Sequence, residues 1–185
     1  MKSLLTTTCL TLCLLATVVN AGAQQQITFA NLPRVSSPSP MPNGYGQLDW
    51  GNFFYVDPFR WAGAGAGYKL GSNNQDVAFI GGEYCRLSGG NTCTGTLTST
   101  GEFELISANL AGGFGPAAVT AIAYNNGNYV GTMNFFVGTQ LETINFPSSW
   151  GVITEVSLQV TGQTNDLVIY SLNVYNIVQD PPPPQ

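Results

Sequence analysis

The stretch AIAYNNGNYVGTM, residues 121–133, carries a strong local signal for the fold. Its centre is Asn126-Gly127, a pair that favours a tight type I′ turn because both central positions of that turn require a positive φ. The flanking residues read as short strands that such a turn connects. The stretch therefore predicts a hairpin of two antiparallel strands.

Most of the remaining chain shows an apolar period of two, which is typical of strands with one buried face. In EVSLQV, residues 155–160, the apolar side chains fall on one face, and residues 168–174 repeat the pattern. No window of a dozen residues shows a helical stripe. We expect an all-β fold, an antiparallel β-sandwich of jelly-roll type with one disulfide. Further strands are expected at 27–29, 52–56, 77–80, 101–106, 134–137 and 142–146.

The two ends of the chain differ in composition from its middle. Met1-Lys2, an apolar run and Ala21-Gly22-Ala23 together predict a signal peptide over residues 1–23, with a retained anchor as the alternative. Residues 24–178 are expected to form a single β-sandwich domain. The QDPPPPQ ending predicts a disordered proline-rich tail over residues 179–185. The predicted localisation is therefore secreted and extracellular.

Without the leader, four basic residues stand against ten acidic ones, so the net charge is −6. An acidic chain with so few cations offers no electrostatic footprint for nucleic acid or anionic lipid. We therefore expect neither a nucleic-acid partner nor, once the signal is removed, a membrane.

Cys85 and Cys93 are the two cysteines that remain after the leader. In an exported protein they meet an oxidising environment, and the Ser88-Gly89-Gly90-Asn91 centre between them is typical of a hairpin turn. We predict a disulfide across this turn. The rival reading, a redox or metal site, is disfavoured because the spacing is not C-x-x-C and the chain contains no histidine.

This disulfide gives a first testable prediction. The intact mass should lie about 2 Da below that of the reduced chain, as the loss of two hydrogens requires, and no thiol should react under denaturing conditions. Replacing both cysteines by serine should lower stability by about 2.5 kcal/mol, because a small loop is no longer closed in the unfolded state. A labelled thiol in the folded secreted protein would refute the bridge.

Several motifs occur in an order that covers nearly the whole mature chain: ITFANLP, then MPNGYGQLDWGNFFYV, then GEFELISANLAGGF, and a closing IYSLNVYNI. With them the chain resembles a family of small secreted fungal β-sandwich proteins with a P-x-P-x-G-Y-x-x-L-x-W-x-N-F box. The resemblance implies a galactose-binding-like or carbohydrate-module-like jelly roll, mostly of undetermined function. The box corresponds here to Gly44, Tyr45, Leu48, Trp50, Asn52 and Phe53.

The chain departs from this family at positions that are often acidic. Ala30 and Asn31 follow ITF, and Asn173 replaces an aspartate in the closing strand. Because Ca²⁺ prefers six to eight oxygen ligands with carboxylates among them, these losses disfavour a structural calcium site, and no other cofactor is expected.

The candidate ligand-binding segment is DPFRWAGAGAGYKLGSNNQD, residues 57–76. Aromatic rings can stack on sugar C–H faces while amides and carboxylates contact hydroxyls. In the alternative interpretation this is a loose glycine loop whose tryptophan packs on the edge of the sandwich, and the glycines match no nucleotide-binding loop. Large aromatics such as Trp50 and Phe53 are instead expected in the core. The predicted ligand-binding residues are Trp61, Phe59, Tyr68, Asn73, Asn74 and Asp76.

Without histidine, the sequence excludes Ser-His-Asp and Cys-His chemistry and histidine-bound zinc. A two-carboxylate glycoside hydrolase survives, but no carboxylate lies in a recognisable catalytic motif, so no catalytic residue is assigned. The carboxylates considered for it are Asp49, Asp57, Glu83, Glu102 and Glu104.

The sequence is thus compatible with three functions. The first is a secreted non-catalytic module that binds carbohydrate, either a cell-wall polysaccharide or a cell-surface glycan. The second is a secreted effector-like protein that binds a host or cell-surface protein. The third is the two-carboxylate hydrolase.

Overall fold

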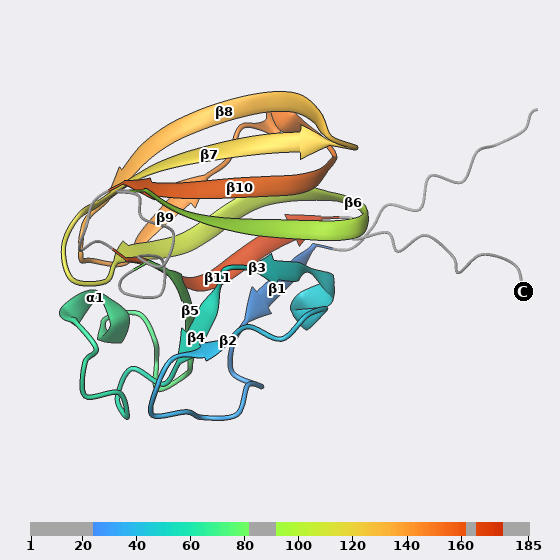
Figure 1. Cartoon of the computed structure of the whole chain (residues 1–185). Helices are drawn as coiled ribbons and strands as arrows, with labels where there is room; N and C mark the ends of the chain where they lie inside the picture. The colour runs from blue at the N-terminus through green and yellow to red at the C-terminus, as the bar shows by residue number, and fades with distance from the viewer. Residues whose placement is uncertain (1–23, 82–91, 162–165, 176–185) are drawn as a thin grey trace, which may run out of the picture.

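The computed structural model describes residues 24–81, 92–161 and 166–175, and these form an almost entirely antiparallel β structure (Figure 1). The prediction of an all-β sandwich is confirmed. The expected leader and tail lie outside the described residues. So does Cys85, and its disulfide with Cys93 therefore stays a prediction.

One layer, the upper sheet of Figure 1, has the strand order β3-β6-β10-β7-β8. β7 and β8 form the hairpin expected at residues 121–133, and Asn126 and Gly127 both have a positive φ, 49° and 76°. The strand bounds are β3 (Asp49–Gly51), β6 (Thr92–Gly112), β7 (Ala117–Asn125), β8 (Asn128–Val137) and β10 (Ile153–Thr161).

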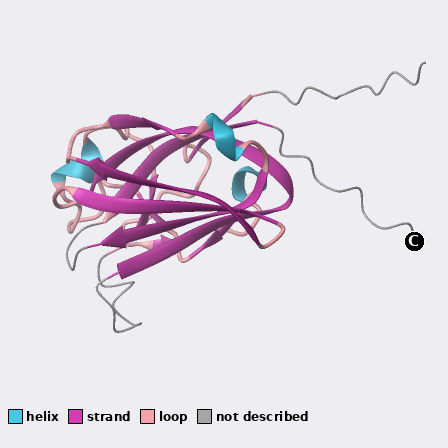
Figure 2. Ribbon diagram, turned by 90° about the horizontal axis from the view of Figure 1, so that it is seen from above, coloured by secondary structure: helices cyan, strands magenta, loops and turns pink. Residues whose placement is uncertain are grey.

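The other layer, the lower sheet, has the order β2-β4-β5-β11-β6-β9, and β1 also pairs with β11. Its strand bounds are β1 (Gln25–Thr28), β2 (Ser39–Pro40), β4 (Phe54–Val56), β5 (Val77–Ile80), β9 (Glu142–Asn145) and β11 (Leu167–Tyr175). The helical elements are single turns, as Figure 2 shows: η1 (Tyr45–Gln47), α1 (Ala66–Lys69) and η4 (Ser148–Trp150).

β6 belongs to both layers. Its first part pairs with β10 as far as Phe103, and from Glu104 onward it pairs with β11. The expectation of a short strand at 101–106 was therefore wrong in length. Core-facing residues are odd-numbered up to Leu105 and even-numbered from Ala108, because a register irregularity shifts the alternation by one residue. That shift concealed the continuity of the strand.

Two aromatic residues of the G-Y-x-x-L-x-W-x-N-F box, Trp50 and Phe53, lie in the hydrophobic core, as expected. Trp50 is 4% exposed and Phe53 is 2% exposed. The Trp50 ring meets Phe29 and Phe53 edge-on, with centroids 5.6 and 5.2 Å apart, and its Nε1–H donates to the carbonyl of Tyr45 at 2.8 Å. The box therefore joins the turn at Tyr45 to the sandwich interior.

A second hydrophobic cluster covers part of the outer face of the lower sheet. Tyr68 of α1 packs with Phe79 of β5, and Trp61 lies against both rings. A Cβ on Gly67 would overlap the carbonyl oxygen of Gly112. The close approach of α1 to β6 therefore requires glycine at this position. Within the described part of the chain, no helix is long and apolar enough to cross a membrane.

Candidate functional site

The outer face of the lower sheet carries two cross-strand rows of uncharged polar residues. Their strand neighbours Ile27, Leu172, Ala108 and Ile144 pack in or against the core, so the row residues point to the opposite face. The first row is Gln26, Asn173, Ser107 and Asn145; the second is Thr28, Ser171, Asn109 and Thr143.

Hydrogen bonds hold three of the four side chains of the second row in place. The Asn109 amide donates to Ser171 Oγ at 2.9 Å and accepts from Thr143 Oγ1 at 2.7 Å. The side chains of Gln26 and Thr28 have no such partner among the described residues. The two rows thus combine side chains fixed by hydrogen bonds with two polar side chains, Gln26 and Thr28, that are free to bind a ligand.

A hollow of about 280 Å³, the β11 hollow, lies between this face and the loop before β5. The sheet contributes Gln26, Thr28, Asn109, Tyr170 and Ser171, and the walls contribute Gly71, Asn73, Gln75 and Leu141. Burial raises the pKa of Tyr170 to about 12, so its phenol stays neutral at physiological pH.

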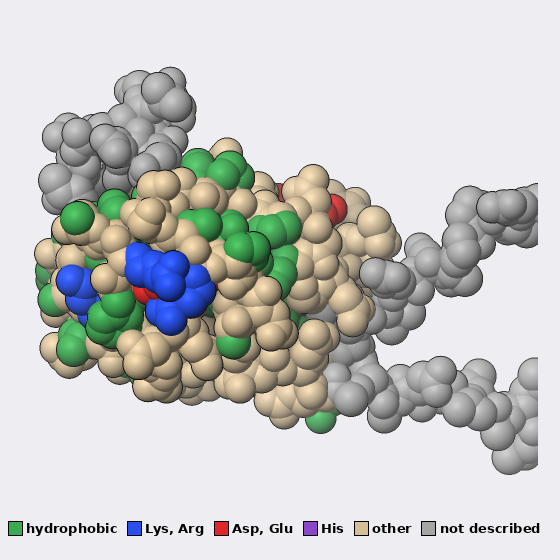
Figure 3. Space-filling model, turned by 90° about the horizontal axis from the view of Figure 1, so that it is seen from below, with side chains coloured by type: hydrophobic (Ala, Val, Ile, Leu, Met, Phe, Trp, Pro, Cys, Tyr) green, Lys and Arg blue, Asp and Glu red, His purple; other side chains and the backbone are tan. Residues whose placement is uncertain are grey.

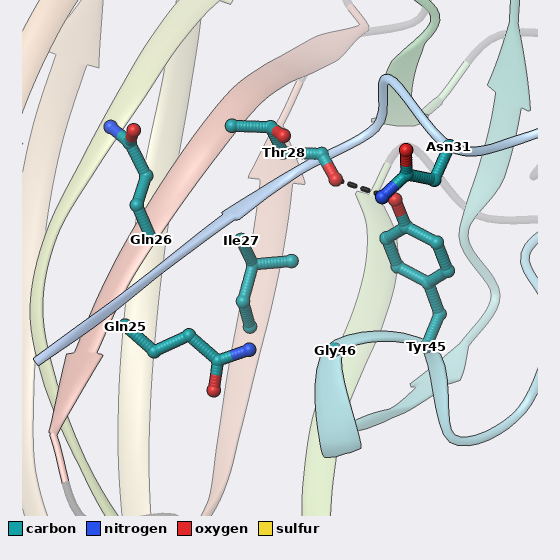
Figure 4. Close-up of a pocket in the computed structure, with 7 residues that line it drawn as sticks. All are labelled: Gln25, Gln26, Ile27, Thr28, Asn31, Tyr45 and Gly46. Carbon is teal, nitrogen blue, oxygen red and sulfur yellow. Dashed lines mark hydrogen bonds between the residues drawn. The ribbon is translucent and has the colours of Figure 1, made fainter. Parts of the chain in front are cut away.

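A second hollow of about 210 Å³, the Tyr45 hollow, adjoins it at β1 (Figure 4). The half-buried Tyr45 ring stacks on Phe29 with centroids 5.9 Å apart, and its hydroxyl donates to the Thr28 carbonyl at 2.5 Å. Burial also raises the pKa of Tyr45, which keeps it protonated. The lining residues are Gln25, Gln26, Ile27, Thr28, Asn31, Tyr45 and Gly46.

Gln26 and Thr28 line both hollows, so we treat the two hollows as one site and call it the β1 groove. None of its lining side chains is charged. Amides and hydroxyls both donate and accept hydrogen bonds, and Tyr45 adds an aromatic surface. The β1 groove is therefore chemically suited to an uncharged, hydroxyl-rich molecule.

The residues that the sequence predicted as ligand-binding do not lie together in the structure. Asn73 lines the β11 hollow, and Asn74 is exposed beside it. Phe59 is 53% exposed, whereas Trp61 is half-buried and stacks on Phe79 with centroids 6.1 Å apart. Trp61 thus packs on the second cluster, in keeping with the alternative interpretation of its loop.

Tyr68 and Asp76 have almost no exposed surface, at 0% and 3%. The Tyr68 hydroxyl donates to the Asp166 carboxylate inside the second cluster. As arranged here, neither side chain reaches a surface where a ligand would lie, so their assignment to direct ligand contact is corrected: both support the loop from within.

Sequence reasoning missed most of the β1 groove, including Gln26, Thr28, Tyr45, Asn109 and Ser171. The available signal was the polar face of the alternating segments QITF, SANL and YSLNV. Such a face is also ordinary for a solvated strand, and only the pairing of distant strands turns it into a continuous surface.

Buried charges lie in a cluster outside the groove. Asp57 is fully buried, pairs with Arg34 at 2.7 Å and Arg60 at 3.3 Å, and accepts the Phe59 N–H at 2.9 Å. Burial, and then the neighbouring Asp57 charge, raise the pKa of Asp76 to about 6, while the two arginines oppose the shift. Figure 3, which views the molecule from below Figure 1, shows a group of basic side chains with a small area of acidic side chain beside them.

The carboxylates give no support to glycosidase chemistry at this site. Glu83 lies outside the described residues, and no carboxylate that the structure describes lines the β1 groove. The exposed Glu102 accepts a hydrogen bond from Asn125 at 3.1 Å. Among the described residues, no group of three or more His, Cys, Asp or Glu side chains is placed to hold a metal ion.

Comparisons with known proteins found two solved structures of interest; no family model and no curated protein matches the sequence. A DUF4465 family protein from Bacteroides caccae is 12% identical, with 87% of this chain and 96% of that chain covered and a TM-score of 0.45. TmCBM61, solved in complex with β-1,4-galactotriose, is 10% identical, with 69% and 86% covered and a TM-score of 0.38. At such identities and TM-scores, the two matches assign no ligand to this chain.

Proposed function

We propose that this protein is a secreted, non-catalytic module that binds carbohydrate, such as a cell-wall polysaccharide, in the β1 groove. The observation that carries the proposal is the lining of the groove, which combines amides, hydroxyls and the Tyr45 ring without a charged side chain. Sugars offer many hydroxyls that both donate and accept, and apolar C–H faces that pack on aromatic rings. The predicted signal peptide supports an extracellular ligand.

The contact of Trp61 with Phe114 favours a second candidate, binding to a host or cell-surface protein. The ring centroids lie 6.2 Å apart, and Phe114 is 49% exposed. Phe59, two residues before Trp61 in the sequence, is 53% exposed. Exposed aromatic residues of this kind are common at the centres of protein interfaces. Protein binding through this aromatic surface would leave the β1 groove unused.

A matched pair of glutamine variants tests the proposal. Gln26→Ala removes a free amide from the centre of the groove, and we expect affinity for the retained polysaccharide to fall about tenfold, since about 1.4 kcal/mol of hydrogen bonding is lost. Binding is first measured by retention on insoluble chitin, cellulose and β-glucan, together with a glycan array.

Gln159→Ala is the control, because Gln159 lies on the outer face of the upper sheet between the core residues Leu158 and Val160. It should bind like the wild type. Equal losses in the two variants would place the binding elsewhere. If the wild type bound no glycan on any surface but bound a deglycosylated cell-surface protein, the second candidate would replace the first.

A further inference from the structure

The β1 groove consists of two hollows on either side of a shared centre. Neither hollow alone reaches the roughly 300–1,000 Å³ of sites that enclose a drug-sized molecule, but the two together do. Gln26 and Thr28 stand where the hollows meet, so a molecule that fills both must lie across β1.

The two hollows differ in chemistry. The Tyr45 hollow offers the face of a half-buried ring with Asn31 beside it. The β11 hollow offers amides from two separate elements, Asn73 and Gln75 from the loop before β5 and Asn109 from β6. One end of the groove therefore suits stacking against a C–H face, and the other suits multiple hydrogen bonds to hydroxyls.

The charges around the groove define the ligand further. The basic side chains nearest in the sequence to Asn31 and Asn73 are Arg34 and Lys69, and neither lines a hollow. Arg34 pairs instead with Asp57. A carboxylate or sulfate placed in either hollow would lose water without gaining a cationic partner, which is unfavourable. The groove thus discriminates against anionic sugars.

Resting on the proposed function, we infer that the ligand is a linear, uncharged glycan that crosses β1 and places different sugar units in the two hollows. Binding then depends on chain length, because a single sugar unit occupies one hollow while a longer chain gains the contacts of both. Gln26 and Thr28 contact the middle of the bound segment.

The test is a calorimetric titration with β-1,3-gluco-, β-1,4-gluco- and β-1,4-galacto-oligosaccharides of one to six units. We expect affinity to rise at least tenfold from one unit to about three and then to level off. Polygalacturonate, an anionic linear chain, should bind at least tenfold more weakly than the best neutral chain.

Two variants probe the ends of the groove. Asn31→Ala alters the Tyr45 hollow, and Asn73→Gly alters the β11 hollow while accommodating the positive φ of 45° at that position. Both residues are exposed, so the fold should persist. Each variant should lose most of the gain with chain length and keep the weak affinity for one unit in the other hollow.

The outcomes separate this inference from the proposed function. Equal affinity for one and six units, or an effect of only one of the two variants, would refute the inference that one glycan chain occupies both hollows. Carbohydrate binding itself would still stand. Tight binding of polygalacturonate would overturn the preference for uncharged glycans. If no saccharide bound, the proposed function would fail and this inference with it.

Discussion

Replacing Trp50 by alanine is expected to lower the free energy of unfolding by about 3–5 kcal/mol. The ring is 4% exposed and fills space between Phe29 and Phe53, so its removal leaves a cavity in the main core. The variant also loses the Nε1–H donor to the Tyr45 carbonyl, which holds the turn of the box. Urea unfolding at constant pH measures the change.

Trp61→Ala is the matched comparison, since it removes the same side chain from a half-buried position. Because the Trp61 ring stacks on Phe79, we expect this change to lower the free energy of unfolding by about 1–2 kcal/mol. A loss for Trp50→Ala no greater than that for Trp61→Ala would contradict the burial on which both values rest.

The features that the sequence predicted well are local. Asn126-Gly127 carries its own turn preference, and the alternation over 155–160 needs no knowledge of partner strands. The strand expected at 77–80 coincides with β5. Each of these elements is determined by residues within a few positions of one another, so a reading of the chain by short windows finds them.

The features that the sequence did not predict depend on contacts between distant segments of the chain. Thr28, Asn109 and Ser171 become neighbours only because β1 and β6 both pair with β11. The glycine-rich run before β5 shows no helical pattern, yet α1 forms there because Gly67 fits closely against β6. Tertiary packing overrides weak local preference in such segments.

The candidate ligand-binding segment, residues 57–76, was predicted in part and missed in part. Its composition indicated aromatic and amide side chains near one another, and Asn73 does reach the groove. Composition alone did not indicate which aromatic rings are buried. Tyr68 is buried because α1 turns it toward Phe79 and Asp166, both of which follow it in the chain, Asp166 by 98 positions.

Neutralising the two buried aspartates, Asp57 and Asp76, should change the free energy of unfolding with opposite signs. At pH 8, Asp57→Asn should lower the free energy of unfolding by about 2–3 kcal/mol, because two ion pairs with Arg34 and Arg60 are lost. The cost stays at the low end for a buried pair because both arginines are partly exposed and regain water.

Asp76→Asn should instead raise stability at pH 8, by about 1–3 kcal/mol. The pKa of Asp76 is raised to about 6 in the folded chain, chiefly by burial, and its Oδ1 has no hydrogen-bond partner among the described residues. The folded state therefore holds this proton more tightly than the unfolded state, whose pKa is near the ordinary value of 3.8. Its contribution to stability is largest below pH 4 and is lost as the pH rises through 6.

Urea unfolding at pH 4, 6 and 8 separates the two effects, with Glu155→Gln on the outer face of the upper sheet as the control, for which a change within about 0.5 kcal/mol is expected. The advantage of Asp76→Asn over the wild type should shrink toward pH 4, where the wild-type carboxyl is already neutral in the folded state. Changes of the same sign for Asp57→Asn and Asp76→Asn at pH 8 would contradict the arrangement in which the two arginines neutralise Asp57 and leave Asp76 without a hydrogen bond to Oδ1.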